Sequence, residues 1–314
     1  MTLNELRYIV AVARERHFGR AAESCFVSQP TLSVAVKKLE DELGVVLFER
    51  GGPEIQPTAV GARIVEQAMR TLEQAEEIRQ LAARGKDPLA GPLRLGAIFT
   101  VGPYLLPRLI PVLHRRAPAM PLLIEEDYTA ALAERLKNGE LDAIVISLPF
   151  REPGVVVQRL YTEPFVAAVP AGHRWEQAAA VDPARLAEED LLLLGAGHCF
   201  RDQVLQACPG CQRSGATGSL QRTLEGGSLE TIRQMVATGA GVTVLPCTCV
   251  GTNPANDRLT PIRPFKQPAP TREVALAWRR SFPRPEAVEA VRQAVLRSRL
   301  PCVSLHRDSE PEPA

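Results

Sequence analysis

Residues 18–33 read FGRAAESCFVSQPTLS, and their order specifies the first domain of the chain. The pattern predicts a short helix over residues 20–24, a tight turn, and a second helix that begins near Ser28 and ends before Gly44. Ser28 is positioned to cap this second helix, and Pro30 is tolerated in its first turn. Two short helices joined by such a turn are typical of a helix-turn-helix motif.

The second helix is expected to present a polar face to solvent. Its apolar positions, which the helical period turns inward, are Leu32, Val36, Leu39 and Leu43. Polar side chains gather at its amino-terminal end, the end that enters the major groove in this motif. They can bond base edges or phosphates, although a solvated helix face without a partner is the simpler alternative. The residues that we expect to contact double-stranded promoter DNA are Ser28, Gln29, Pro30, Thr31, Ser33, Lys37, Lys38 and Arg50.

A small wing and a long helix are expected after this motif. Residues 45–50 are expected to be extended, and Gly51-Gly52-Pro53 predicts a turn. Thr58 can cap a long helix whose narrow apolar stripe consists of Ile64, Ala68, Leu72, Ala75, Ile78 and Ala82. A stripe of this width packs against one partner, so we predict a dimerising linker; a surface helix folded onto its own domain is the alternative. Residues 84–88 predict a hinge.

Strands alternate with helices in the rest of the chain. A parallel sheet covered by helices is predicted by the order of strand 93–99, helix 104–116, strand 122–125, helix 129–138 and strand 141–147. A second cluster of the same kind spans roughly residues 164–264. The strand 273–278 and the helix 286–300 are expected to return to the first cluster. Two lobes with two crossings form a cleft, where small ligands tend to bind.

These patterns predict an α/β protein with an all-α winged helix-turn-helix at its start. The expected limits are 1–58 for the winged head, 59–87 for the linker helix and hinge, and 88–303 for a two-lobed sensing domain. Lobe I takes about residues 88–162 and 266–300, and lobe II about 163–265. The remaining residues, 304–314, are rich in Pro and Glu and are expected to be disordered.

Composition limits the possible functions. The 314 residues carry 37 basic and 36 acidic side chains, so the net charge gives no argument for nucleic-acid binding. Any such argument must rest on the local arrangement of the side chains. No secretory signal is apparent, and no apolar run approaches the roughly eighteen residues of a membrane span. We therefore expect a cytoplasmic protein. Its seven cysteines are an odd number in a reducing compartment, which disfavours a permanent disulfide framework.

Several short motifs within about the first 65 residues can be compared with known families. They are Ala21-Ala22, Ser28-Gln29-Pro30-Thr31-Leu32-Ser33, Leu39-Glu40, Leu43-Gly44, Leu47-Phe48-Glu49-Arg50 and Pro57-Thr58. Together they resemble the LysR-type transcriptional regulators. The resemblance implies a winged helix-turn-helix, a dimerising linker helix and a two-lobed domain like that of periplasmic binding proteins. It also implies assembly as a homodimer or homotetramer.

An apolar strand, a glycine turn and a helix carry the cysteines of most interest. Residues 191–211 read LLLLGAGHCFRDQVLQACPGC, with Cys199 at the start of the expected helix beside His198 and Arg201. A helix amino terminus and a nearby cation both favour thiolate over thiol. An ordinary cysteine is already roughly 10% thiolate at about pH 7.5. A fast reaction with peroxide therefore also needs donors aimed at the O–O bond, such as His198, Arg201 and a hydroxyl from the other lobe.

Cys208 supplies a second thiol on the same segment. Nine residues of helix separate two Cα atoms by about 13 Å, whereas a disulfide needs roughly 5.5–6 Å. Oxidation of Cys199 to sulfenic acid, followed by condensation with Cys208, would therefore unwind the helix. Such a pair is a switch and not a structural crosslink.

Other interpretations of the cysteines remain open. Two cysteines near a helix are more often buried hydrophobes. Cys208-Pro209-Gly210-Cys211 has the CxxC spacing of a thioredoxin-like site or of half a zinc site, to which His198 and Cys199 could add ligands. The sequence has no second CxxC pair, so we expect neither a metal nor another cofactor. Cys247 and Cys249 are interpreted as packing residues.

Further motifs extend through nearly the whole chain. They are Gly197-His198-Cys199, Arg201-Asp202-Gln203, Cys208, Ser228-Leu229-Glu230-Thr231-Ile232-Arg233 and Gly241-Val242-Thr243-Val244-Leu245-Pro246. They resemble the peroxide-responsive members of the same family. The resemblance implies Cys199 as the peroxidatic and Cys208 as the resolving cysteine, and a peroxide pocket formed by Thr100, Thr129, His198, Arg201 and, as a weaker match, Arg272. The Pro209-Gly210-Cys211 extension departs from the expected pattern and leaves open whether Cys211 competes with Cys208.

The combined features favour a regulator that senses hydrogen peroxide and activates oxidative-stress genes, and not an enzyme. Its expected partners are promoter DNA, RNA polymerase, hydrogen peroxide, a thiol reductant and further copies of the chain, with no membrane. One alternative is a LysR-type regulator that responds to a small metabolite in the inter-lobe cleft. The other is a thiol peroxidase or oxidoreductase, which would have no use for a helix-turn-helix.

Overall fold

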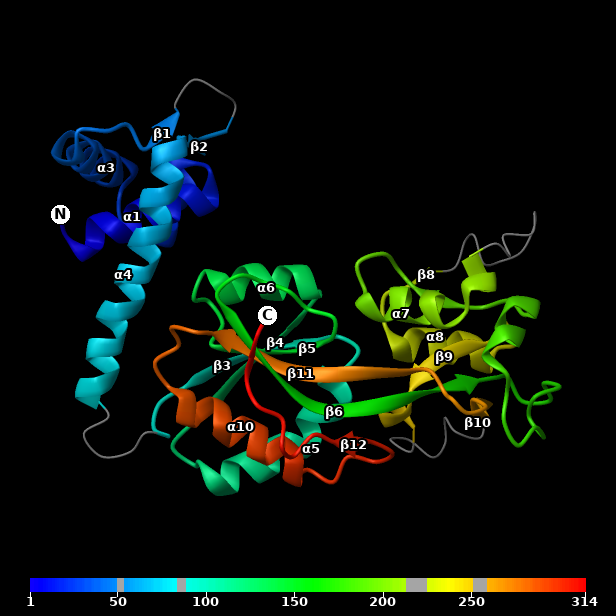
Figure 1. Cartoon of the computed structure of the whole chain (residues 1–314). Coiled ribbons are helices and arrows are strands. Elements are labelled where there is room, and N and C mark those ends of the chain that lie inside the picture. Colours follow the sequence, from blue (N-terminus) through cyan, green and yellow to red (C-terminus); the bar gives the residue numbers. More distant parts are fainter. Residues whose placement is uncertain (50–53, 84–88, 213–224, 251–258) are drawn as a thin grey trace. The chain divides into compact units, whose positions relative to one another are not determined.

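The computed structural model describes residues 1–49, 54–83, 89–212, 225–250 and 259–314 (Figure 1). The chain divides into two compact units, Met1–Asp87 and Pro88–Ala314, and each is described by itself. The expected DNA contact Arg50 and the expected hinge over residues 84–88 lie outside the described residues. In the described part, no helix combines the length and the apolar character that crossing a membrane requires.

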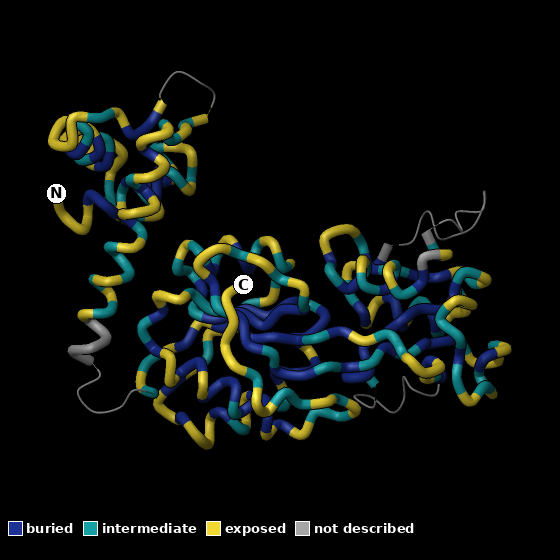
Figure 2. Tube along the Cα trace, in the orientation of Figure 1, coloured by how far each residue is buried: buried dark blue, intermediate teal, exposed yellow. Residues whose placement is uncertain are grey.

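The helices of the first unit enclose a small apolar core (Figure 2). They are α1 (Leu3–Glu15), α2 (Phe18–Ser24) and α3 (Gln29–Leu43). The Ser28 hydroxyl accepts a hydrogen bond from the Thr31 amide at 3.4 Å, which confirms the predicted cap. Gly44 ends α3 with a φ of 69°. Leu43 is 38% exposed and not inside as expected, because it is the last residue of α3 and nothing covers it fully.

A short wing precedes the long helix. β1 (Phe48–Glu49) pairs with β2 (Gln56–Pro57), so the strand is shorter than the extended segment expected over residues 45–50. The long helix is α4 (Ala59–Ala83), and the Thr58 hydroxyl accepts a hydrogen bond from the Gly61 amide at 2.9 Å, as predicted for its cap. Val65 is buried in the core of the head, whereas Ile78 is 68% exposed. Within the described residues of the first unit, the far half of α4 therefore leaves part of its apolar stripe uncovered.

The main sheet of the second unit mixes parallel and antiparallel strands. β3 (Leu93–Ile98) pairs in parallel with β4 (Leu122–Asp127) and β5 (Ala143–Ser147). β11 (Thr271–Arg279) then pairs antiparallel with β5 and with the long strand β6 (Val155–Ala168). The expected parallel sheet is therefore confirmed for β3, β4 and β5, and β11 returns to this sheet as expected but runs in the opposite direction. β11 lies between β5 and β6 and runs opposite to both, so β5 and β6 run in the same direction.

The second unit has two apolar cores, as expected for a two-lobed α/β domain. α5 (Gly102–Arg116), α6 (Thr129–Lys137) and α10 (Pro285–Arg297) contribute to the first core with β3, β5 and β11. The second core is formed by β6, β9 (Thr243–Pro246), α7 (Cys199–Ala207), α8 (Leu229–Ala237) and neighbouring short elements. β6 and β11 run from one lobe into the other (Figure 1). The short elements of lobe II are η1 (Pro183–Glu188), β7 (Leu193–Leu194), η2 (Pro209–Gln212), β8 (Glu225–Gly226), η4 (Cys247–Cys249) and β10 (Ile262–Pro264).

The last residues of the chain form strands, which corrects the expected disorder of residues 304–314. β12 (Ser304–Leu305) and β13 (Glu312–Pro313) both pair antiparallel with β6. The Gln158 side chain donates to the Ser309 carbonyl at 2.6 Å, and Thr162 Oγ1 lies 2.8 Å from His306 Nε2. A polar, proline-rich segment thus gains order because a distant strand offers it hydrogen-bonding groups.

Candidate functional site at the start of α7

Cys199 is the first residue of α7 and is half-buried. The chain enters this helix through Gly197, whose φ of 95° favours glycine and whose added Cβ would lie 3.2 Å from the Tyr128 ring. His198 is the N-cap residue, but its side chain makes no capping hydrogen bond. Cys199 therefore lies in the first turn of α7, at the positive end of the helix dipole.

The environment of Cys199 comes largely from the opposite lobe. Cys199 packs against the core of lobe I, although α7 itself belongs to the core of lobe II. Arg272 on β11 lies within electrostatic reach of Cys199. Burial lowers the pKa of Arg272, but Glu163, Tyr161 and Cys199 together raise it by more, so its net pKa lies above the ordinary value. The guanidinium is therefore a permanent positive charge beside the cysteine.

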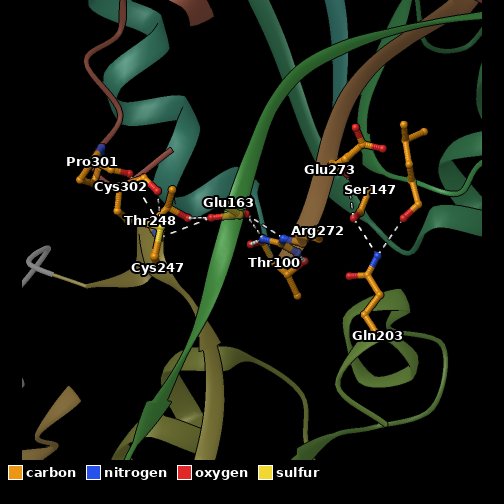
Figure 3. A network of polar contacts seen from close by, with 11 residues as sticks. Thr100, Ser147, Glu163, Gln203, Cys247, Thr248, Arg272, Glu273, Pro301 and Cys302 are labelled. Carbon is orange, nitrogen blue, oxygen red and sulfur yellow. Dashed lines mark hydrogen bonds and ion pairs between the residues drawn. A yellow bond between two sulfur atoms is a disulfide. The ribbon is translucent and has the colours of Figure 1, made fainter. Parts of the chain in front are cut away.

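Arg272 is held by a buried polar network (Figure 3). Its Nε donates to Glu163 Oε1 at 2.7 Å, and both side chains are fully buried. Its Nη1 donates to Thr100 Oγ1 at 2.8 Å, and its Nη2 donates to the Thr100 carbonyl at 2.9 Å. The guanidinium carbon also lies 5.0 Å from the centre of the Phe200 ring, next to Cys199 in the sequence. The structure thus joins the expected pocket residues Thr100 and Arg272 and adds Glu163.

His198 is buried among aromatic rings of lobe I. Its ring centre lies 4.7 Å from that of Tyr128 and 5.9 Å from that of Phe99. Burial lowers the pKa of His198, against a smaller raising effect of a hydrogen bond with the Gly227 backbone, so the ring is neutral at pH 7. Among the described residues, His198 Nε2 and Thr129 Oγ1 are buried polar atoms without a hydrogen-bond partner. A small polar molecule would satisfy such atoms.

Acidification is expected to destabilise the fold in part through His198. Because the folded pKa lies below the ordinary 6.5, the unfolded chain binds the proton first as the pH falls. Stability contributed by neutral His198 is therefore present above pH 7 and is lost as the pH drops through 6.5. Melting temperatures at pH 7.5 and pH 5.5 should differ less in a His198→Gln chain than in the wild type. His114→Gln, at an exposed position, is the matched control and should keep the wild-type difference.

Arg201 braces the turn that leads into α7. Its Nη1 donates to the Leu194 carbonyl at 2.6 Å, and its amide donates to the His198 carbonyl at 3.0 Å. These bonds hold the β7–α7 turn and thereby the position of Cys199. A direct contact of Arg201 with peroxide stays a prediction.

Gln203 fastens α7 to lobe I, and the sequence interpretation gave it no role. Its Nε2 donates to Ser147 Oγ at 2.9 Å and to the Leu148 carbonyl at 3.0 Å (Figure 3). Gln203 lies four residues after Cys199, which puts both on one face of the helix. That spacing is the signal by which it could have been found.

Replacing Gln203 with Ala should make α7 easier to unwind. Each of the two lost hydrogen bonds is worth about 0.5–1.5 kcal/mol, so we expect disulfide formation between Cys199 and Cys208 to become about fivefold to 150-fold faster. Quenched-flow alkylation after a peroxide pulse measures this rate. Gln206→Ala, at an exposed position of the same helix, is the control. An unchanged rate in Gln203→Ala would show that α7 is not held from this face.

Cys208 is bonded to Cys211 in the structure, with the Cα atoms 5.5 Å apart. It caps the end of α7, which is helical from Cys199 to Ala207 as predicted. At about 1.5 Å per residue, Cys199 and Cys208 are therefore about 13 Å apart along the helix. The pairing of Cys199 with Cys208 stays a prediction, and the bond to Cys211 shows that the CxxC spacing already brings a nearer partner within reach.

The other cysteines depart in part from the expected packing roles. Cys249 is fully buried, and burial, followed by Glu163 and other neighbours, raises its thiol pKa well above the usual range. Cys247, by contrast, is in a disulfide with Cys302, which corrects its interpretation as a packing residue. Within the described residues, no group of three or more His, Cys, Asp or Glu side chains is arranged to hold a metal ion.

The expected DNA-contacting residues lie mostly on one accessible end of α3. Ser28, Gln29, Pro30 and Thr31 are exposed, and Ser33 is half-buried. Lys37 and Lys38 are also exposed, although Lys38 Nζ lies 3.5 Å from Glu5 Oε1. The described residues of the first unit therefore leave the amino-terminal turn of α3 exposed.

Gln29→Ala is expected to reduce sequence preference more than general affinity. A base contact of a side chain like this one is worth about 1–3 kcal/mol, or about fivefold to 150-fold in affinity. Lys37→Ala should weaken binding to all duplexes about equally, because phosphate contacts carry no sequence information. Fluorescence anisotropy with a promoter duplex and a scrambled duplex separates the two effects. An equal loss on both duplexes in Gln29→Ala would contradict its role in base reading.

Comparisons with known proteins agree with this architecture. Residues 3–62 match the family described as bacterial regulatory helix-turn-helix protein, lysR family, and residues 86–299 match the LysR substrate binding domain. The DNA-binding transcriptional dual regulator OxyR of Escherichia coli K12 is 38% identical over 94% of this chain and 95% of its own length. A full-length OxyR variant from Pseudomonas aeruginosa is 55% identical, with a TM-score of 0.76 over 94% of this chain and 98% of that one. A peroxide-bound OxyR mutant from Corynebacterium glutamicum is 31% identical, with a TM-score of 0.62 over 95% and 92% of the two chains.

Proposed function

Because this chain belongs to the LysR family of bacterial transcriptional regulators, in the group of hydrogen peroxide-inducible activators, we propose that it senses hydrogen peroxide and activates oxidative-stress genes. The observation that carries the proposal is the place of Cys199. It begins a helix of one lobe, packs against the other lobe, and lies within electrostatic reach of buried Arg272. The peroxide-bound structure of a relative supports the same ligand.

The peroxide step uses groups around Cys199. The thiolate attacks one peroxide oxygen, the O–O bond breaks, and the sulfur keeps OH as a sulfenic acid. The other oxygen leaves as hydroxide and takes up a proton to become water. Arg272 stabilises the developing negative charge. The unpartnered His198 Nε2 and Thr129 Oγ1 provide hydrogen-bonding groups that hold the peroxide.

The second step changes the structure of α7. The Cys208 thiol condenses with the sulfenic acid of Cys199, which forms a disulfide and releases water. The bond closes a distance of about 13 Å, so α7 must unwind and lose the Gln203 hydrogen bonds to lobe I. This change in the sensing domain is the signal that the regulator passes to its DNA-binding head.

Cys211 sets a condition on this switch. A sulfur already bonded to Cys211 cannot condense with a sulfenic acid, so Cys208 is available when the Cys208–Cys211 disulfide is open. A thiol reductant opens that bond, and the same class of reductant resets Cys199–Cys208 by thiol–disulfide exchange. We therefore place the responsive form of the protein in a reducing cytoplasm.

The active assembly is a homodimer or homotetramer on promoter DNA. The winged head of residues 1–58 reads the half-sites, residues 59–87 join two chains, and residues 88–303 sense peroxide. Exposed Ile78 on α4 supports a helix that pairs with a second copy. The promoter-bound form recruits RNA polymerase when α7 has unwound.

A transcript profile of a deletion strain and its complemented partner tests this function. Peroxide should induce a set of genes in the complemented strain, and the chain should occupy their promoters in chromatin immunoprecipitation. The proposal would be wrong if transcription of these genes did not depend on peroxide. A response of the same genes to a small metabolite would instead support a regulator that binds that metabolite in the inter-lobe cleft.

A further inference from the structure

Cys247 and Cys302 join parts of the second unit that are far apart in the sequence. Cys247 begins η4, directly after β9 of lobe II, and Cys302 follows α10 of lobe I. Their sequence separation is 55 residues, and their Cα atoms are 6.3 Å apart. The disulfide therefore links the carboxyl-terminal segment covalently to the other lobe. Two cysteines that served only to fill the core would not form such a link.

On the lobe II side, Cys247 is next to a residue that belongs to the polar network holding Arg272 (Figure 3). Thr248, next to Cys247, donates its hydroxyl hydrogen to Glu163 Oε2 at 2.7 Å. Glu163 Oε1 accepts from Arg272, and Arg272 donates to Thr100. The peptide link from Cys247 to Thr248, followed by two buried hydrogen bonds, thus connects the disulfide with the guanidinium beside Cys199.

The other end of the bond leads to the same part of β6. β12 starts two residues after Cys302 and pairs Ser304 with Thr162, the neighbour of Glu163. Thr162 Oγ1 also lies 2.8 Å from His306 Nε2. The two sides of the disulfide therefore restrain the position of Glu163 from η4 and from β12.

Two carbonyl oxygens lie close to the Cys247 sulfur. Cys247 Sγ lies 3.3 Å from the Cys302 carbonyl oxygen and 3.9 Å from the Pro301 carbonyl oxygen. After reduction, the Cys247 thiol can donate its hydrogen to these oxygens, so the buried group keeps a partner. Cys302 is exposed whereas Cys247 is 3% exposed, so a reagent in solution meets Cys302 first.

We propose that Cys247 and Cys302 form a second redox-active pair, which exchanges with small disulfides such as oxidised glutathione and tunes the reactivity of Cys199. The Cys302 thiolate attacks the small disulfide and releases one thiol; Cys247 then displaces the second thiol and forms the protein disulfide. The protein loses two electrons and two protons, and oxidised glutathione becomes two reduced glutathione molecules. The closed pair fixes Glu163 and therefore Arg272, which favours oxidation of Cys199. This tuning rests on the proposed peroxide function, whereas the exchange itself does not.

The exchange is tested in the full-length Cys199→Ser chain. The protein is equilibrated with glutathione from fully reduced to fully oxidised, its thiols are blocked, and its peptides are mapped by mass spectrometry. We expect the Cys247–Cys302 peptide pair to convert from two blocked thiols to a disulfide within this range. A pair that stays in one state throughout would overturn the proposal, whatever Cys199 does in the wild type.

The tuning is tested with Cys208→Ser/Cys211→Ser chains, in which Cys199 stops at sulfenic acid. After removal of glutathione, trapping of the sulfenic acid should be at least threefold faster with the Cys247–Cys302 bond closed than open. Cys302→Ser should abolish this dependence, and Cys25→Ser, in the other unit, should retain it. Equal rates in both states would refute the tuning. No sulfenic acid in any of these chains would instead refute the proposed peroxide function.

Discussion

A Cys199→Ser chain is expected to bind promoter DNA with wild-type affinity and to lose the peroxide response. A serine hydroxyl has no appreciable anion at neutral pH, whereas an ordinary cysteine is already roughly 10% thiolate at about pH 7.5. Loss of the nucleophile should reduce peroxide-induced transcription more than about 100-fold, because the surrounding charges cannot replace the reacting sulfur. Reporter transcription before and after a peroxide pulse measures the effect, and anisotropy measures DNA binding.

Cys25→Ser is the matched control for this variant. Cys25 is also a half-buried cysteine outside any disulfide, but it lies in the first unit. It should retain both DNA binding and the peroxide response. Normal induction in Cys199→Ser would refute the role of Cys199, and loss of induction in Cys25→Ser would point to general damage by thiol removal.

Arg272→Met is expected to destabilise the second unit strongly. The variant leaves Glu163 buried with its main cation removed, and such a broken pair typically costs about 3–5 kcal/mol. In a domain of this size, that loss corresponds to a fall of about 10 °C in melting temperature. Cys199 should also react more slowly with peroxide, because the positive charge beside it is gone. Differential scanning calorimetry and sulfenic acid trapping measure the two effects.

The double variant Glu163→Gln/Arg272→Met separates these effects. Removing both charges eliminates the unpaired carboxylate, so most of the lost stability should return. The reaction of Cys199 should stay slow, since the guanidinium is still absent. Recovery of fast oxidation in the double variant would show that Arg272 acts on stability alone.

Local sequence chemistry predicted the head well. Ser28 and Thr58 act as caps in the structure, and Gly44 ends α3, because each depends on neighbours within a few residues. The position of Cys199 at the start of α7 was also predicted from its neighbours, because a glycine turn directly precedes the apolar stripe of the helix. The resemblance to a family, and not the local pattern, predicted the residues of a peroxide pocket. Two of those residues, Thr100 and Arg272, are hydrogen-bonded to one another in the structure.

Long-range pairing explains what the sequence did not reveal. Glu163 on β6 meets Arg272 across 109 residues, and Gln203 meets Ser147 across 56, so neither pair leaves a periodic signal. The pairing of the last residues with β6 was hidden in the same way by their polar composition. Cys247 and Cys302 could not be matched from spacing, because many pairings of seven cysteines are possible.

Mass mapping of thiols in the wild-type chain tests the switch most directly. The protein is first fully reduced, which opens Cys208–Cys211, and is then exposed briefly to micromolar peroxide. We predict selective appearance of a Cys199–Cys208 disulfide, with loss of both thiols at the same rate. Cys199 that remains a thiol after this exposure would contradict peroxide sensing at this site.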